Sequence, residues 1–283
     1  MIRIAIQAKG RLNESSLSLL NSVGMDIDTT KRKYLAKSPD FPLEVLYLRD
    51  DDIPQTVSSG AADIGIVGYN EVAERGFAVN VEQELCFGQC RVSLAIPKSE
   101  TYTGPEYFNG RKIATSYPNI LGKWLADNGI NSEIHEIAGS VEIAPSIGVA
   151  DGIFDIVSSG GTLAQNSLQE VETVLESQAV LISNPGISAA NRAILEQLKF
   201  RFQSIIDAGG KKYLLMNIPT SAVDEAIRII PAMRSPTVMP LALKGWSSLH
   251  SVVSGKDLWD KVDQLKKIGA EGILVLDLEK IIK

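Results

Sequence analysis

Five consecutive small residues are the strongest candidate for a ligand site in this chain: Ser158, Ser159, Gly160, Gly161 and Thr162. They follow the apolar run 153–157, which is typical of a buried strand and contains one acid, Asp155. Glycines let backbone N–H groups approach an oxyanion, hydroxyls add donors, and a helix N-terminus carries partial positive charge. An acid at the end of the strand can bind ribose hydroxyls or a magnesium ion held by a phosphate. The pattern predicts a phosphate-binding loop, and an ordinary strand-to-helix turn with Thr162 as N-cap is the alternative.

Other polar residues follow the strands predicted earlier in the chain. Lys9 and Arg11 come after strand 2–6, and Arg49 comes after strand 43–48. Asp63 and Gly68 flank a third apolar strand. In open α/β sheets, ligands bind at the carboxyl ends of the strands. We therefore expect these residues to converge with the 155–162 segment, although a solvated loop is an equal alternative for residues 9–11.

The hydrophobic pattern predicts an α/β fold, because strands alternate with helices along residues 1–208. This alternation indicates largely parallel sheets covered on both faces. Further strands are predicted at 88–97, 111–115, 134–137 and 179–183, and helices at 13–23, 54–59, 120–128, 141–148, 162–174 and 189–208.

An internal repeat relates two parts of the chain. The segment 60–68 resembles 148–155, since both read as a helix end, a Gly-x-Ala-Asp turn and a buried strand. Two copies suggest two similar lobes rather than a solenoid, which needs more repeats. Asp155 has no acidic counterpart in the first copy, where Val67 occupies the matching position.

The last 70 residues have a different pattern. After a linker at 208–210, the predicted order is strand 212–218, helix 222–230, strands 238–243 and 247–253, helix 255–268 and strand 272–276. This β-α-β-β-α-β order is the ferredoxin-like signature. The segment has no acid–base cluster, so we expect a binding or regulatory module, with simple oligomer packing as the alternative.

Composition excludes several classes of protein. The net charge of −6 argues against a nucleic-acid-binding surface. The only cysteines, Cys86 and Cys90, are too few for a disulfide framework and lie far from both histidines, so neither a zinc site nor an oxidised scaffold is expected. The N-terminus has no signal-peptide pattern and no apolar run reaches membrane-spanning length, so we expect a cytoplasmic protein without a membrane partner.

Motifs along the whole chain resemble one family, the long form of ATP phosphoribosyltransferase. They are Lys9-Gly10-Arg11-Leu12, RDDDIP at 49–54, DIGIVG at 63–68, GQCR at 88–91, IATSYP at 113–118, GSVEIAP at 139–145, DIVSSGGTL at 155–163, RSPT at 234–237 and GAEGIL at 269–274. Residue 161 is glycine where relatives often carry Ala or Thr, which keeps the loop permissive.

The resemblance implies a three-part architecture. Residues 1–90 and 180–206 would form one lobe of periplasmic-binding-protein type, and residues 91–179 would form the second. Residues 211–283 would form an ACT-like domain that binds histidine. A homo-oligomer, either a dimer or a hexamer, is expected.

The resemblance also implies a reaction, the first step of histidine biosynthesis. A pentosyltransferase of this family joins N1 of ATP to C1 of 5-phosphoribosyl 1-pyrophosphate. The products are 1-(5-phosphoribosyl)-ATP and pyrophosphate, Mg²⁺ is required, and histidine inhibits by feedback. Breaking the bond to pyrophosphate builds charge that Mg²⁺ and cationic side chains can neutralise.

Residue roles follow from matching these motifs to that reaction. We assign the 5′-phosphate to residues 158–162, the ribose hydroxyls to Asp155 and the phosphates across the cleft to Arg11 and Arg49. Glu142 is a weaker candidate for orienting ribose or adenine. The predicted ATP-binding set is Lys9, Gly10, Arg11, Arg49 and Asp63. The predicted histidine-binding set is Asn217, Ser235, Thr237 and Gly272. Mg²⁺ would be held largely by substrate phosphates, and no direct protein ligand is predicted.

Three other functions stay open on the sequence. A solute-binding protein shares the two-lobed fold, but the missing signal peptide counts against it. A non-catalytic regulatory partner would not need an intact 155–162 segment. A type I phosphoribosyltransferase would carry a pair of acids at the strand end, whereas Ile156 follows Asp155 here.

Overall fold

The computed structural model describes residues 1–25, 27, 35–38, 41–230 and 235–283. These residues form two compact units, Met1–Lys199 and Phe200–Lys283, and the boundary falls within helix α6 (Ala189–Ala208). Arg234 of the RSPT motif lies outside the described residues. No helix in the described ranges is long and apolar enough to cross a membrane.

The first lobe of unit 1 is built on a six-stranded sheet. Its strand order is β2 (Leu35–Lys37), β3 (Leu43–Leu48), β1 (Ile2–Gln7), β4 (Ile64–Gly68), β11 (Ala179–Ser183) and β5 (Asn80–Glu84). The helices that follow β1, β3 and β4 are α1 (Arg11–Ser22), α2 (Ile53–Ser58) and α3 (Tyr69–Arg75). Apolar side chains from strands and helix pack together, for example Ala5, Ile53, Val57 and Val67.

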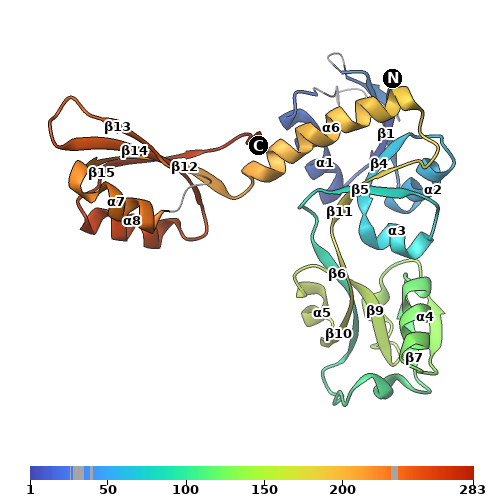
Figure 1. The fold of residues 1–283 in the computed structure, drawn as a ribbon. Coiled ribbons are helices and arrows are strands. Elements are labelled where there is room, and N and C mark those ends of the chain that lie inside the picture. Colours follow the sequence, from blue (N-terminus) through green and yellow to red (C-terminus); the bar gives the residue numbers. More distant parts are fainter. Residues whose placement is uncertain (26, 28–34, 39–40, 231–234) are drawn as a thin grey trace. The chain divides into compact units, whose positions relative to one another are not determined.

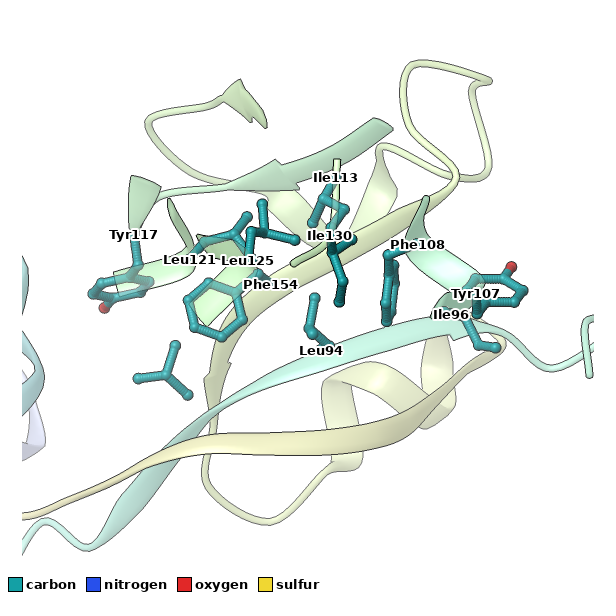
Figure 2. Close-up of a cluster of buried hydrophobic side chains, with 11 residues drawn as sticks. Leu94, Ile96, Tyr107, Phe108, Ile113, Tyr117, Leu121, Leu125, Ile130 and Phe154 are labelled. Atoms are coloured by element: carbon teal, nitrogen blue, oxygen red, sulfur yellow. The ribbon is translucent and has the colours of Figure 1, made fainter. Parts of the chain in front are cut away.

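The second lobe is built on a five-stranded sheet. Its order is β10 (Leu168–Ser177), β6 (Cys90–Pro97), β9 (Gly152–Val157), β7 (Lys112–Thr115) and β8 (Glu133–Glu136). Helix α4 (Pro118–Asp127) covers one face, and the short helix α5 (Gly161–Gln165) follows β9. Leu94, Phe108, Leu121 and Phe154 meet in the buried core between sheet and α4, and Tyr117 lies at one end of this cluster (Figure 2).

Both sheets are mixed, so the prediction of largely parallel sheets was wrong. Strand β1 runs parallel to β3 and β4, but β11 runs antiparallel to β4 and β5. In the second lobe β7 runs parallel to β8 and β9, whereas β6 runs antiparallel to β9 and β10. Antiparallel strands need no helical crossover. The strands that run against the direction of the others are β2, β6 and β11. Of these, β6 and β11 belong to the segments by which the chain passes between the lobes.

Two predicted helices are corrected. The helix predicted through Val174 ends at Gln165, and strand β10 replaces its second half. Bulges at Glu170–Glu172 and Thr173–Leu175 break the strict alternation that would have indicated a strand. The helix predicted at 141–148 is a single 3₁₀ turn, Val141–Ile143, because Pro145 cannot continue a regular helix.

The internal repeat is confirmed in structure. Asp63 Oδ2 accepts a hydrogen bond from the Arg3 N–H at 2.8 Å, and Asp151 Oδ2 accepts one from the Lys112 N–H at the same distance. Each acid lies just before its strand, β4 or β9, and accepts a hydrogen bond from the backbone of a neighbouring strand, β1 or β7. The shared Gly-x-Ala-Asp turn therefore fixes the start of a strand in each lobe.

Unit 2 has the predicted ferredoxin-like topology. Its antiparallel sheet has the order β13 (Thr237–Pro240), β14 (Trp246–Ser254), β12 (Lys211–Pro219) and β15 (Glu271–Asp277). Helices α7 (Val223–Ile229) and α8 (Leu258–Lys267) lie on one face of this sheet (Figure 1). Leu214, Met216 and Leu249 point toward the helices and are fully buried.

Candidate active site between the two lobes

A cleft of about 530 Å³ lies within unit 1, and both lobes contribute to its walls. Most of its lining comes from the ends of strands β1, β3, β4, β7 and β9 and the segments that follow them, and residues 88–90 and Glu142 complete it. The expected convergence at the carboxyl ends of strands is met in part, since Arg11, Gly68 and the 155–162 segment line the cleft, whereas Lys9, Arg49 and Asp63 do not. Of the predicted residues, the cleft is lined by Gly10, Arg11, Glu142, Asp155, Ser158, Ser159, Gly160, Gly161 and Thr162.

The first lobe contributes the start of α1. Gly10 is the N-cap residue and has a φ of +92°, a conformation that favours glycine. A Cβ at this position would lie 3.6 Å from Gln7 Oε1. The Asn13 side chain donates to the Gln7 carbonyl at 2.6 Å and does not cap the helix, so α1 begins at Arg11, earlier than predicted. The tight turn places Gly10 and Arg11 at the cleft.

The second lobe contributes the predicted phosphate loop. Gly160 is the N-cap of α5 and takes a left-handed φ of +77°, so Thr162 lies inside the helix instead of capping it. The first N–H groups of a helix have no partner within the helix, and those of α5 belong to residues that line the cleft. Arg91 donates to the Ser158 carbonyl at 3.3 Å and forms an ion pair with Glu170, which fixes the start of the loop.

Asp155 lies near the end of β9, where the strand enters the loop. Its Oδ1 accepts a hydrogen bond from the Ile156 N–H at 2.8 Å. Burial raises the pKa of the Asp155 carboxyl to about 6, and the negative charge of Glu142 adds to the rise, while the Ile156 bond opposes it. A carboxylate that is only partly satisfied by the protein can accept hydrogen bonds from a ligand's hydroxyl groups.

A buried polar network closes the cleft at the junction of the lobes. The Tyr117 hydroxyl donates to Glu71 Oε1 at 3.2 Å, and Asn70 Nδ2 donates to the same carboxylate oxygen at 3.0 Å. Burial, together with the nearby charge of Asp50, raises the pKa of the Glu71 carboxyl. These three residues line the cleft and give it fixed acceptors and donors.

Acidic side chains predominate in the described lining of the cleft. Four carboxylates line it, those of Asp50, Glu71, Glu142 and Asp155, and among the described lining residues Arg11 is the one cation. No group of three or more His, Cys, Asp or Glu side chains in the described part of the chain could hold a metal ion by itself. Among the described lining residues, acidic side chains therefore outnumber basic ones.

Comparison with known proteins identifies the family. The family described as ATP phosphoribosyltransferase matches residues 49–204, and the family described as the HisG C-terminal domain matches residues 208–280. The chain belongs to the ATP phosphoribosyltransferase family. It is 55% identical over 282 residues to an ATP phosphoribosyltransferase of Phocaeicola vulgatus, with 100% of each chain covered. The family places the chain among the pentosyltransferases and in histidine biosynthesis.

Solved structures agree with the fold. An ATP phosphoribosyl transferase (HisG:HisZ) complex from Thermotoga maritima superposes with a TM-score of 0.62 at 27% identity, covering 72% of this chain and 96% of that one. The substrate binding protein of an amino acid ABC transporter superposes with a TM-score of 0.50 at 12% identity, covering 74% of this chain and 94% of that one. The second likeness concerns the fold alone, and it agrees with the predicted lobes of periplasmic-binding-protein type.

Three predicted ATP-binding residues of this family member do not line the cleft. Asp63 was expected at the carboxyl end of a strand, and this placement was wrong, because it precedes β4. Its carboxylate instead accepts bonds from the Arg3 N–H and from Asn191 Nδ2. Arg49 is 80% exposed and pairs with Asp51 at 3.2 Å, and Lys9 is also exposed. We remove Asp63 from the candidate site, while roles for Lys9 and Arg49 stay predictions.

Several residues that line the cleft were not predicted from the sequence. Gln7, Asp50, Asn70, Glu71 and Tyr117 were given no role, although each lies at or just beyond the end of a strand. The rule that selected Arg11 would have found them too. Helix α3 was not predicted, so Asn70 and Glu71 were not placed at the start of a helix.

The predicted histidine-binding residues do not form one group in unit 2. Asn217 on β12 lies beside Gly272 on β15, where a Cβ on Gly272 would lie 3.4 Å from Asn217 Nδ2. Thr237 lies on β13, and Ser235 just precedes that strand. Strands β13 and β15 are the two edges of the sheet, with β14 and β12 between them. Within one chain the four residues therefore lie in two separate places, and their role in binding histidine stays a prediction.

Proposed function

We propose that this chain transfers the phosphoribosyl group of 5-phosphoribosyl 1-pyrophosphate to N1 of ATP, yielding 1-(5-phosphoribosyl)-ATP and pyrophosphate. The observation that carries the proposal is the convergence of the 155–162 segment with Arg11 at one cleft. Family membership supplies the substrate classes. The cleft of about 530 Å³ lies within the size range of small-molecule sites.

The second lobe would bind 5-phosphoribosyl 1-pyrophosphate. Backbone N–H groups of residues 159–162 and the hydroxyl groups of the loop would hold the 5′-phosphate. Asp155 would accept hydrogen bonds from the ribose hydroxyls, which requires the ionised carboxylate. Arg91, which bonds to Ser158 and to Glu170, would keep the loop in place without touching the substrate.

The first lobe would bind ATP. Gly10 and Arg11 would contact its phosphates, since Arg11 has a bidentate donor geometry suited to phosphate. Adenine N1 carries a lone pair, so the reaction needs no protein nucleophile. The contribution of the protein would be to align N1 with C1 of the ribose and to exclude water as the lobes close.

Magnesium is proposed as the cofactor. The excess of carboxylates over cations at the cleft fits a polyphosphate substrate that arrives with its own cation. Mg²⁺ prefers oxygen ligands and keeps several waters, so substrate phosphates would supply most of its ligands. When bound, it would neutralise the pyrophosphate leaving group.

Histidine is proposed as a feedback inhibitor that binds the C-terminal unit. Gly272 has a φ of +57° and lies beside the Asn217 side chain. Because Gly272 has no side chain, a ligand held by Asn217 could approach the Gly272 backbone closely. A site that used Asn217, Gly272, Ser235 and Thr237 together would have to combine two copies of the chain, because Thr237 and Gly272 lie on opposite edge strands of one sheet. This requirement supports the proposed homo-oligomer.

The test is a spectrophotometric assay of phosphoribosyl-ATP with purified protein, millimolar substrates and Mg²⁺. Product should form only with both substrates present, and an excess of EDTA should stop it. Histidine should inhibit wild-type protein without competing with ATP, and Asn217→Ala should weaken this inhibition. Absence of product from folded protein would refute the transferase proposal, and competition between histidine and ATP would refute the separate histidine site.

A further inference from the structure

Helix α3 buries polar residues. Its buried side chains are those of Asn70, Glu71 and Glu74, all on the side that meets the second lobe. Figure 1 shows α3 at the edge of the first lobe, directly beside α4. A helix usually buries an apolar stripe. An interface made of polar groups can be hydrated when it opens, so this surface suits two lobes that separate and rejoin.

Glu74 makes the most direct connection between the lobes. Its Oε1 accepts a hydrogen bond from the Asn119 N–H at 2.9 Å, and its Oε2 accepts one from the Ile120 N–H at 3.0 Å. The Asn119 side chain donates back to the Glu74 carbonyl at 3.0 Å. Glu74 is 4% exposed. Three hydrogen bonds therefore join one turn of α3 to the first turn of α4.

Helix α4 lacks a cap from its own segment. Its N-cap residue is Tyr117, which makes no side-chain capping bond, and Pro118 occupies the first turn. The free N–H groups of a helix N-terminus need acceptors, and a carboxylate also interacts favourably with the helix dipole. Glu74 supplies both from the other lobe. Opening the lobes would leave these N–H groups and the carboxylate to water.

We propose that Glu74 is a positioning residue that holds the two lobes in the arrangement that forms the cleft. Two neighbouring hydrogen bonds also join helix α3 to the second lobe. The Asn70 N–H donates to Ser177 Oγ on β10 at 3.0 Å, and Tyr117 bonds to Glu71. Because Tyr117 lines the cleft and begins α4, the position of α4 sets the position of one cleft wall. Glu74 itself does not line the cleft, so it acts through α4.

The kinetic test rests on the proposed transferase activity. If Glu74 stabilises the closed arrangement, Glu74→Gln lowers the closed fraction, and apparent affinity falls by the same factor. We expect KM for at least one substrate to rise by about tenfold or more, with kcat within about twofold of wild type. Asn119→Ala removes only the return bond, so a smaller rise is expected. Glu225→Gln, an exposed acid in the first turn of α7, is the matched control and should change neither constant.

In folded Glu74→Gln, a lower kcat with unchanged KM values would overturn the proposal. Unchanged KM values in both Glu74→Gln and Asn119→Ala would also overturn it. Where Glu74→Gln does not fold, Asn119→Ala decides by the same criterion.

Amide hydrogen exchange tests the contact independently of activity. In Glu74→Gln the Asn119 and Ile120 amides should exchange about tenfold faster or more than in wild type, while the Leu125 and Ala126 amides keep their protection. Wild-type protection at Asn119 and Ile120 in the variant would overturn the proposal. If wild-type protein made no phosphoribosyl-ATP, the proposed function would fail, and the exchange result alone would decide the role of Glu74.

Discussion

Replacing Asp155 by asparagine should stabilise the protein while it impairs binding of the ribose. Burial raises the Asp155 pKa to about 6 from an ordinary value of 3.8, which means that the folded state disfavours the charged form. At roughly 1.4 kcal/mol per pH unit, the difference corresponds to about 3 kcal/mol of unfolding free energy above pH 6, as an upper value. The uncharged amide side chain of the Asp155→Asn variant avoids this cost, and its oxygen can still accept the Ile156 N–H.

The increase in unfolding free energy caused by Asp155→Asn should be large at neutral pH and should disappear in acid. Above pH 6 the wild-type carboxyl is charged in both folded and unfolded chains, so Asp155→Asn shows its full advantage. As the pH falls from about 6 to about 4, the folded protein takes up the proton first and the advantage disappears. Kinetics should move the opposite way, since kcat/KM for 5-phosphoribosyl 1-pyrophosphate should fall by about tenfold or more when an ionised acceptor is lost.

The assay is urea unfolding at pH 7.5 and pH 4.5, followed by Trp124 fluorescence in a background with Trp246 and Trp259 replaced by phenylalanine. Asp127→Asn, at an exposed position on α4, is the control and should change stability by less than about 0.5 kcal/mol. A loss of stability in Asp155→Asn at pH 7.5, or an equal gain at both pH values, would refute the burial argument.

Three further substitutions test separate parts of the structure. Thr162→Ala should lower kcat/KM for 5-phosphoribosyl 1-pyrophosphate by about ten- to a hundredfold, because a hydroxyl donor to a charged phosphate is lost; unchanged kinetics would move the phosphate elsewhere. Gly10→Ala should lower the free energy of unfolding by about 1–3 kcal/mol, because residue 10 has a φ of +92°. Gly122→Ala in α4 is the control and should be neutral or stabilising, since Gly122 has an ordinary φ and its nearest neighbour would lie 3.7 Å from the new Cβ. Equal effects of the two substitutions would contradict the strain argument. Burial alone would raise the pKa of Glu82, but hydrogen bonds from Ser183, Arg192 and Lys199 outweigh it and hold this pKa below its usual range. Glu82→Gln should therefore lower the free energy of unfolding by about 1–3 kcal/mol at pH 7, and by less as the pH falls below 4. Thermal unfolding at both pH values would measure this difference.

The positions of most strands and helices could be predicted because their hydrophobic periodicity is undisturbed. Strand Leu43–Leu48 and helix Ala189–Ala208 have the predicted bounds. The failures have local causes. Bulges in β10 interrupt the alternation that would have predicted a strand. Pro145 ends the turn at Val141–Ile143, although the apolar pattern favoured a longer helix there.

The candidate site was predictable where a residue follows a strand directly. Arg11 and the 158–162 loop were found in this way, and Gln7 and Asp50 obeyed the same rule. Asp63 was wrongly assigned to the ATP site because the Gly-x-Ala-Asp turn has a structural role. That role becomes clear only when the Asp63 bond to the Arg3 N–H is compared with the equivalent Asp151 bond to the Lys112 N–H. The contact between Glu74 and α4 joins residues 45 positions apart in sequence and from different lobes, so no local pattern could indicate it.

The most direct test of the account is to follow both products of the reaction. Phosphorus NMR of wild-type protein with ATP, 5-phosphoribosyl 1-pyrophosphate and Mg²⁺ should show phosphoribosyl-ATP and pyrophosphate appearing in equal amounts, and Thr162→Ala should slow both equally. Pyrophosphate released without phosphoribosyl-ATP, or unchanged substrates in the presence of folded wild-type protein, would contradict transfer between two substrates aligned in this cleft.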